Sequence, residues 1–155
     1  MGIEIERKFL VSQLPFSLGT KRGAKIRQGY IIATDDGLEL RVRQKDERFF
    51  QTVKFGEGLA RTEIEIELSE KQFMQLWPNT QGRRVSKVRY PVPVTQGTAE
   101  LDIFDGELDG LLLVEVEFDT VDESRQFEPP DWFGTEVTED KRYKNKHLSV
   151  HGIPK

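Results

Sequence analysis

The chain has 155 residues, of which 36% are hydrophobic and 32% charged, with a net charge of −4, two histidines and no cysteine. These values exclude disulfides and thiolate metal sites, argue against disorder, and disfavour general binding to nucleic acid or acidic membranes. The length predicts one domain over residues 1–155, and without an apolar signal core or bilayer-spanning run that domain is expected in the cytoplasm with no membrane partner.

Strands dominate the predicted elements. In chain order, we expect strands over residues 3–11, 25–33, 38–44, 49–55, 61–68, 83–90, 99–104 and 111–118. The first hairpin signal is Thr34-Asp35-Asp36-Gly37, between the second and third strands. Because most connections are tight turns, the strands are expected to pair antiparallel.

Two or three short helices accompany the strands. Ser69 with Gln72 three residues later forms a capping box, and the helix that follows is expected to stop at Pro78. Asp122 is expected to cap a second short helix. Thr138 is expected to cap a last helix that runs to about Ser149.

Charged residues of both signs occupy alternate positions of one predicted strand after another, so that they share a face. A single face of this kind is typical of a solvated antiparallel sheet. Here the pattern recurs on most strands, and the opposite face is strongly apolar and too large for the helices to cover. Both observations favour an α+β fold with a closed eight-stranded antiparallel β-barrel, a polar lumen and a few flanking helices. The apolar outside would pack on helices or on a second subunit, which allows a homodimer.

The charges on the predicted inner face indicate the ligand. The cations suit phosphate oxygens and are Lys8, Arg41, Arg43, Lys54, Lys87 and Arg89. The carboxylates would repel a bare anion and suit a hard divalent cation such as Mg²⁺ or Mn²⁺; they are Glu4, Glu6, Asp102, Glu115 and Glu117. A polyphosphate together with its metal ion fits both sets of charges.

The ordered motifs resemble a known family. Glu4-Ile5-Glu6-Arg7-Lys8 resembles the ExExK signature of the CYTH superfamily, the triphosphate tunnel metalloenzymes. The resemblance covers nearly the whole chain, whose length is similar to that of the short bacterial single-domain members. The later motifs are Glu39-Leu40-Arg41-Val42-Arg43, Thr52-Val53-Lys54, residues 63–67, Lys87-Val88-Arg89-Tyr90, Asp102, Glu115-Val116-Glu117 and residues 139–145.

The resemblance implies a tunnel that binds a triphosphate and acts on it with a divalent metal. The expected reaction is the hydrolysis of inorganic tripolyphosphate to pyrophosphate and phosphate. The alternatives are a class IV-like adenylate cyclase, a thiamine triphosphatase, and a polyphosphate-binding module without turnover, because fold alone does not choose among these activities.

The resemblance also implies roles for individual residues. The carboxylates named above would bind metal and the cations would hold phosphate oxygens. Glu63 and Glu65 would either bind a second metal or orient the arginines. Lys87 is a candidate general base, with a phosphate clamp as the equal alternative. The sequence itself makes Tyr30, which follows Gln28-Gly29, a candidate for the tunnel mouth or for plain packing. Lys144 with its neighbour Asn145 either closes one end of the tunnel or lies on a solvated helix face.

Overall fold

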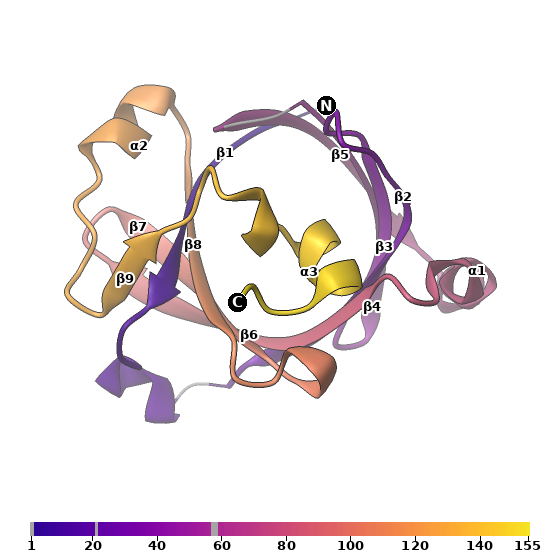
Figure 1. The fold of residues 1–155 in the computed structure, drawn as a ribbon, viewed down its shortest axis with the longest axis horizontal. Coiled ribbons are helices and arrows are strands. Elements are labelled where there is room, and N and C mark those ends of the chain that lie inside the picture. The colour runs from indigo at the N-terminus through magenta and orange to yellow at the C-terminus, as the bar shows by residue number, and fades with distance from the viewer. Residues whose placement is uncertain (1, 21, 57–58) are drawn as a thin grey trace.

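The chain folds into a closed antiparallel β-barrel, which the computed structural model describes over residues 2–20, 22–56 and 59–155 (Figure 1). Neighbouring strands follow the order β5-β4-β3-β2-β6-β7-β8-β1, and β5 pairs with β1 to close the barrel. This closure confirms the predicted α+β barrel. The barrel strands are β1 (Gly2–Val11), β2 (Ala24–Ala33), β3 (Glu39–Lys45), β4 (Arg48–Phe55), β5 (Ala60–Leu68), β6 (Arg84–Val94), β7 (Gly97–Phe104) and β8 (Leu112–Phe118).

One strand boundary was predicted wrongly. Strand β6 continues through Pro91 and Pro93 to Val94, where we had expected those prolines to end it. Pro91 lies opposite Glu100 of β7, but the partner on the other side, β2, begins opposite Arg89. This part of β6 therefore has a free edge, where a strand tolerates residues without an N–H group.

The helical segments are short and lie outside the strands of the barrel or across one end. They are η1 (Phe16–Thr20), α1 (Glu70–Leu76), η2 (Trp77–Thr80), η3 (Gly106–Leu108), α2 (Val121–Gln126), η4 (Lys141–Tyr143) and α3 (Asn145–His151). The capping box of Ser69 and Gln72 at the start of α1 is confirmed. The helical path goes on past Pro78, because η2 follows α1 directly and holds the proline near its start.

Two predicted caps are wrong. Thr120, rather than Asp122, caps α2, because its hydroxyl accepts from the backbone N–H of Glu123. Thr138 does not start the last helix: its hydroxyl accepts from the backbone N–H of Lys8 and donates to Glu136. A further strand that the sequence did not predict, β9 (Phe133–Glu136), pairs with the end of β1, so the chain just before Thr138 is bound to the barrel.

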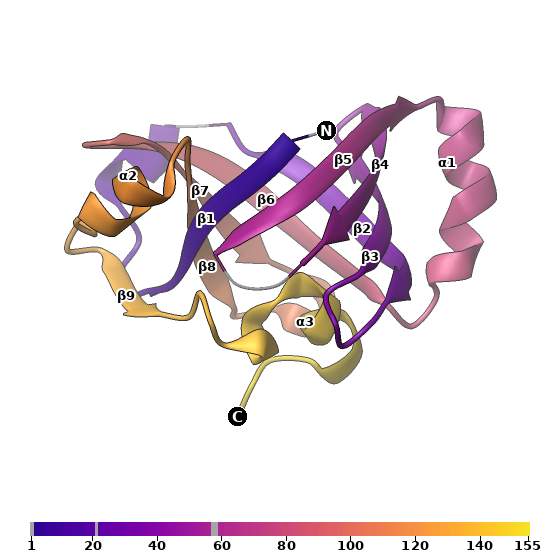
Figure 2. The same cartoon turned by 90° about the horizontal axis from the view of Figure 1, so that it is seen from above.

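Three apolar clusters surround the charged lumen. The first lies between the outer face of β1, β7 and β8 and the segment around α2 and β9, and the second lies beneath α1. The third fills one end of the barrel, where Leu148 of α3 packs with Val85, Phe104 and Leu113. Figures 1 and 2 show α3 lying across that end. Part of the outer face stays exposed, with Ile3 and Ile66 at 73% and 51%, and the homodimer remains a prediction.

The cluster beneath α1 gives a test of the fold. Phe73 is fully buried, and its ring centroid lies 4.9 Å from that of Phe49 and 5.2 Å from that of Trp77. We expect Phe73→Ala to lower the free energy of unfolding by about 3–5 kcal/mol through lost burial and a residual cavity. Urea denaturation measures this change. The control is Met74→Ala, which removes a half-exposed side chain next door and should cost less than about 1 kcal/mol.

Candidate active site

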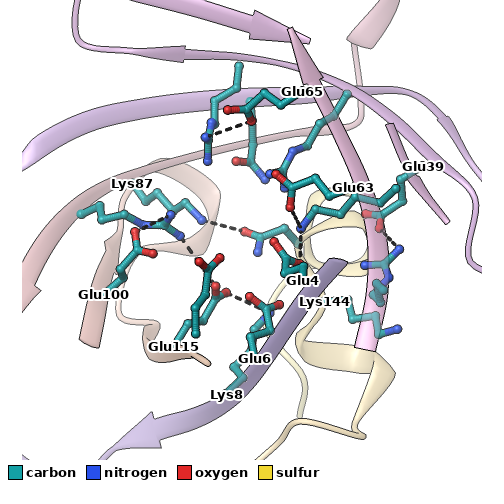
Figure 3. Close-up of a pocket in the computed structure, with 18 of the residues that line it drawn as sticks. Glu4, Glu6, Lys8, Glu39, Glu63, Glu65, Lys87, Glu100, Glu115 and Lys144 are labelled. Atoms are coloured by element: carbon teal, nitrogen blue, oxygen red, sulfur yellow. Dashed lines mark hydrogen bonds and ion pairs between the residues drawn. The ribbon is translucent and has the colours of Figure 1, made fainter. Parts of the chain in front are cut away.

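The inner faces of all eight barrel strands converge on one cavity; seven strands contribute charged residues, and β2 contributes Gln28 and Tyr30. The volume of the cavity is about 300 Å³, and its wall is almost entirely polar or charged (Figure 3). The residues after β9 complete the wall through Val137, Thr138, Asp140, Lys144 and Asn145. The cavity is therefore a tunnel segment with a polar lining, as the alternation of charges along the strands predicted.

All six cations chosen from the sequence reach this cavity: Lys8, Arg41, Arg43, Lys54, Lys87 and Arg89. Lys8, Arg41, Lys54 and Lys87 expose less than a tenth of their surface. The Nε atoms of Arg41 and Arg43 are buried without a hydrogen-bond partner in the part of the chain that the structure describes. Burial, together with the positive charges of Arg41 and Arg89, lowers the pKa of Arg43 to about 10. The cavity thus holds donors and positive charge that an anion would satisfy.

Four of the predicted metal ligands line the same cavity: Glu4, Glu6, Glu115 and Glu117. Carboxylate oxygens of Glu4, Glu6 and Glu117 lie within 4.8 Å of one another. Burial, and then the nearby charge of Glu115, raises the pKa of Glu6 to about 8. Three crowded carboxylate oxygens, two of them on half-buried side chains, fit a hard divalent cation, whose charge would offset their repulsion.

Glu115 is placed differently from this trio. Its carboxylate lies 3.4 Å from the amino group of Lys8 and 4.0 Å from Arg89. Burial alone would raise the pKa of Glu115, but the charges of Lys8 and Arg89 hold it well below its usual value. Glu115 is therefore an ionised partner of the cations.

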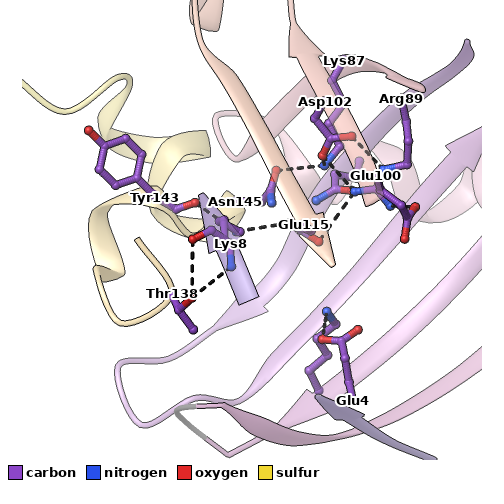
Figure 4. A network of polar contacts seen from close by, with 12 residues as sticks. Glu4, Lys8, Lys87, Arg89, Glu100, Asp102, Glu115, Thr138, Tyr143 and Asn145 are labelled. Carbon is purple, nitrogen blue, oxygen red and sulfur yellow. Dashed lines mark hydrogen bonds and ion pairs between the residues drawn. The ribbon is translucent and has the colours of Figure 1, made fainter. Parts of the chain in front are cut away.

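Asp102 does not line the cavity as the sequence suggested; it lies behind it. Its side chain is 1% exposed. The carboxylate accepts two hydrogen bonds from Arg89, at 2.7 and 2.8 Å, and forms an ion pair with Lys87 at 2.8 Å (Figure 4). Burial raises its pKa, but the charges of Arg89 and Lys87 more than reverse this and lower it. This geometry gives Asp102 the position of a counter-ion that holds two cations toward the cavity.

Glu63 and Glu65 both reach the cavity wall on β5, but their surroundings differ. A hydrogen bond to Glu4 and then burial raise the pKa of Glu63 to about 7. Burial would also raise the pKa of Glu4, but its bond to Glu63 and the charge of Lys54 lower it to about 2. Glu65 instead accepts a hydrogen bond from Thr52 at 2.8 Å and lies 3.5 Å from Arg43. Glu63 thus extends the carboxylate cluster, and Glu65 sits beside an arginine.

Of the two alternatives for Tyr30, the tunnel mouth and plain packing, the structure has the tyrosine packed. Its side chain is 1% exposed within the cavity wall, and its hydroxyl accepts hydrogen bonds from Gln28 at 3.0 Å and from Arg41. Burial raises the pKa of its hydroxyl above the usual value. Lys144, by contrast, lines the cavity between η4 and α3, at the end that α3 covers.

Sequence reasoning left several wall residues out of the site. Glu100, Glu39 and Arg61 line the cavity, and Arg61 makes a close ion pair with Glu39. The strand alternation contained this signal, because Glu100 shares the face of Asp102 and Glu39 that of Arg41. Asn145 was a candidate, with Lys144, for closing one end of the tunnel, but its hydrogen bond to Lys87, at 3.2 Å to Oδ1, had no such signal.

The CYTH domain family model matches residues 2–147. The chain belongs to this family. It is 51% identical to an inorganic triphosphatase of Nitrosomonas europaea over 148 residues, which cover 95% of this chain and 97% of the relative. An inorganic triphosphatase of Acetivibrio thermocellus is 37% identical over 150 residues, covering 96% and 94% of the two chains.

A solved structure agrees with this assignment. A crystal structure described as that of an inorganic triphosphatase is 48% identical, covers 99% of each chain and superposes with a TM-score of 0.72. The family and the barrel predicted from the motifs of this CYTH chain are therefore confirmed. In the described residues of the chain, no helix is long and apolar enough to cross a lipid bilayer.

The position of Asp102 gives a test that separates a counter-ion from a metal ligand. We expect Asp102→Asn to lower the free energy of unfolding by about 3 kcal/mol in EDTA, because it leaves two buried cations without their carboxylate. Urea denaturation in EDTA measures the change. The loss of a carboxylate that only binds metal would not lower the metal-free stability, because it would relieve repulsion among the other ligands. The control is Asp122→Asn in the exposed Asp122–Arg125 pair, which should cost less than about 0.5 kcal/mol.

Proposed function

We propose that this CYTH chain is a divalent-metal-dependent inorganic triphosphatase, which hydrolyses inorganic tripolyphosphate to pyrophosphate and phosphate. The observation that carries the proposal is the closed tunnel, whose wall combines six buried or half-buried cations with a cluster of three carboxylates. Two relatives that match almost the full chain bear the name inorganic triphosphatase. A cavity of about 300 Å³ suits a small, highly charged substrate.

Glu4, Glu6 and Glu117 would hold the metal ion, which we propose to be Mg²⁺ or Mn²⁺ because every available donor is an oxygen. Such an ion, when bound, supplies charge neutralisation of phosphate oxygens and activation of a water molecule. Glu63 adds a neighbouring carboxyl group to the cluster through its hydrogen bond to Glu4. A second metal at Glu63 would require the loss of the proton in the hydrogen bond between Glu63 and Glu4.

The cations of the wall bind and orient the substrate. Arg41 and Arg43 offer unpaired guanidinium donors, and Arg89 is held in place by Asp102. The amino group of Lys54 donates a hydrogen bond to Glu4 at 2.8 Å. The proposed phosphate-binding cations and the proposed metal-binding carboxylates are therefore in direct contact at this pair. Phosphoryl transfer depends mainly on positioning and charge stabilisation, which this wall provides without a protein nucleophile.

Lys87 is the proposed catalytic residue. Burial lowers the pKa of its amino group to about 8, although the charge of Asp102 opposes the shift. A lysine with this pKa exists partly as the free amine near neutral pH and can accept a proton from an attacking water molecule at Nζ. When protonated, the same group is a phosphate clamp, so both roles lie within its chemistry.

The first experiment is a phosphate-release panel with tripolyphosphate, ATP and thiamine triphosphate, each with Mg²⁺, Mn²⁺ or EDTA. We expect tripolyphosphate to have the highest kcat/KM and EDTA to abolish turnover. Equal or greater activity on either organic triphosphate would contradict the proposed substrate. The absence of phosphate release from all three, with tripolyphosphate still bound, would identify a binding module.

The second experiment removes one proposed metal ligand. We expect Glu4→Gln to retain tripolyphosphate binding in calorimetry but to lose at least about 100-fold in kcat, since one donor of the metal site is neutralised. The control is Glu128→Gln, which neutralises an exposed carboxylate outside the tunnel and should leave kcat unchanged. Normal turnover of Glu4→Gln would remove Glu4 from the metal site.

The third experiment decides between the two roles of Lys87. We expect Lys87→Ala to lose at least about 100-fold in kcat with a KM within about 3-fold of the parent, because the group acts on a proton in the transition state. Steady-state kinetics measures both values. A fall in substrate affinity that accounts for the whole loss of kcat/KM would make Lys87 a clamp only.

A further inference from the structure

The chain after β9 contributes to the tunnel, although it is not part of the barrel. It folds back across one end of the strands, as Figure 2 shows for α3. Leu148 is 2% exposed in the apolar cluster at that end, and Lys146 donates to the backbone oxygen of Thr34 at 2.9 Å. Helix α3 is therefore docked on the barrel, and the residue at its start has a defined position.

That residue is Asn145, which contacts the proposed catalytic lysine. The amino group of Lys87 lies 2.8 Å from Asp102 Oδ2 on β7 and donates to Asn145 Oδ1 on α3 at 3.2 Å. A lysine ammonium group has three N–H donors. Two contacts from separate elements fix the rotation of the group and leave one donor for a ligand in the cavity.

The same segment also contacts Lys8. Its amino group donates to the backbone oxygen of Tyr143 at 3.2 Å, and its backbone N–H donates to Thr138 Oγ1 at 3.0 Å (Figure 4). Two cations of the wall are thus oriented by residues 138–145. Of the two contacts to amino groups, the one to Lys8 comes from a backbone oxygen, and the one to Lys87 comes from a side chain that a substitution can remove.

The chemistry of an amide suits this place. Asn145 offers a neutral oxygen, so it can orient the amino group of Lys87 without adding negative charge to a cavity that must accept a polyanion. A carboxylate here would add to the field of Asp102 and repel the substrate. Since Asn145 also lines the cavity, this charge would face the ligand directly.

We propose that Asn145 is a positioning residue, which holds the amino group of Lys87 in the orientation that acts on the substrate. This role rests on the proposed tripolyphosphatase function. It assigns a part in the reaction to the C-terminal segment, whose residues lie far in sequence from the motifs on the barrel strands.

The test begins with Asn145→Leu, which keeps the approximate size of the side chain but removes the acceptor. We expect kcat for tripolyphosphate to fall about ten-fold while KM changes by less than about 3-fold, the pattern of a lost hydrogen bond to a charged group that acts in the transition state. The matched control is Asn79→Leu, at an exposed position of η2 outside the tunnel, which should have the kinetics of the parent. Thermal unfolding verifies that each variant is folded, and Asn145→Ala replaces a variant that is not.

A double-mutant cycle then shows whether Asn145 acts through Lys87. We expect Asn145→Leu to have no further effect on kcat in a Lys87→Ala background. If that background has no measurable turnover, the cycle is measured on the affinity for tripolyphosphate in EDTA, where Asn145→Leu should weaken binding about 3-fold in the parent and not in Lys87→Ala.

Two results would overturn the proposal: an Asn145→Leu variant with the kcat of the parent, or additive effects in the cycle. An inactive parent protein is a separate outcome, because it refutes the tripolyphosphatase function itself. The affinity cycle in EDTA then still decides whether Asn145 positions Lys87.

Discussion

The structure depends on how many charges a closed barrel can bury. Moving an ion from water into a poorly solvated interior costs several kcal/mol, and the cost is offset only where opposite charges and hydrogen bonds meet it. The most buried charges of this tunnel satisfy that condition: Asp102 pairs with both Lys87 and Arg89, and Lys54 pairs with Glu4. Other groups of the cavity lack such a partner. Among the described residues, the Nε atoms of Arg41 and Arg43 have no hydrogen-bond partner, and the carboxylates of Glu6 and Glu117 crowd against that of Glu4.

The arginine donors without partners and the crowded carboxylates lie in one cavity, and this arrangement links stability to function. Burial, and then the like charges nearby, raises the pKa of Glu6 and lowers that of Arg43, so both groups are destabilised in their charged forms. A polyphosphate accompanied by a divalent cation would supply the missing charge to both groups. The tunnel is therefore complementary to a metal–phosphate pair rather than to either ion alone, which agrees with the mixed signs along each strand.

Most of the barrel and much of the site could be predicted, because the strand period is two and relates sequence position to a face. The positions of Glu4, Arg41 and Lys87 on one wall follow from this period, as does the place of Glu100, which we overlooked. The two-residue period of a strand does not reveal how deeply a side chain is buried. Asp102 shares the inner face, yet it lies beneath Arg89 and Lys87 and is covered by them. Likewise, nothing in the sequence around Tyr30 decided between the tunnel mouth and burial in the wall.

The contacts of the C-terminal segment with the barrel could not be predicted, for a different physical reason. Its contacts join residues more than fifty positions apart, such as Asn145 with Lys87, and they depend on how β9 and Thr138 direct the chain back over the barrel. No local periodicity records such a path. The local signals even misled us, because Thr138 has the chemistry of a helix cap but uses its hydroxyl to bind β1. The groups of this segment that contact the amino groups of Lys8 and Lys87 are neutral oxygens, of Tyr143 and Asn145, so these contacts leave the charge of both lysines available to an anion.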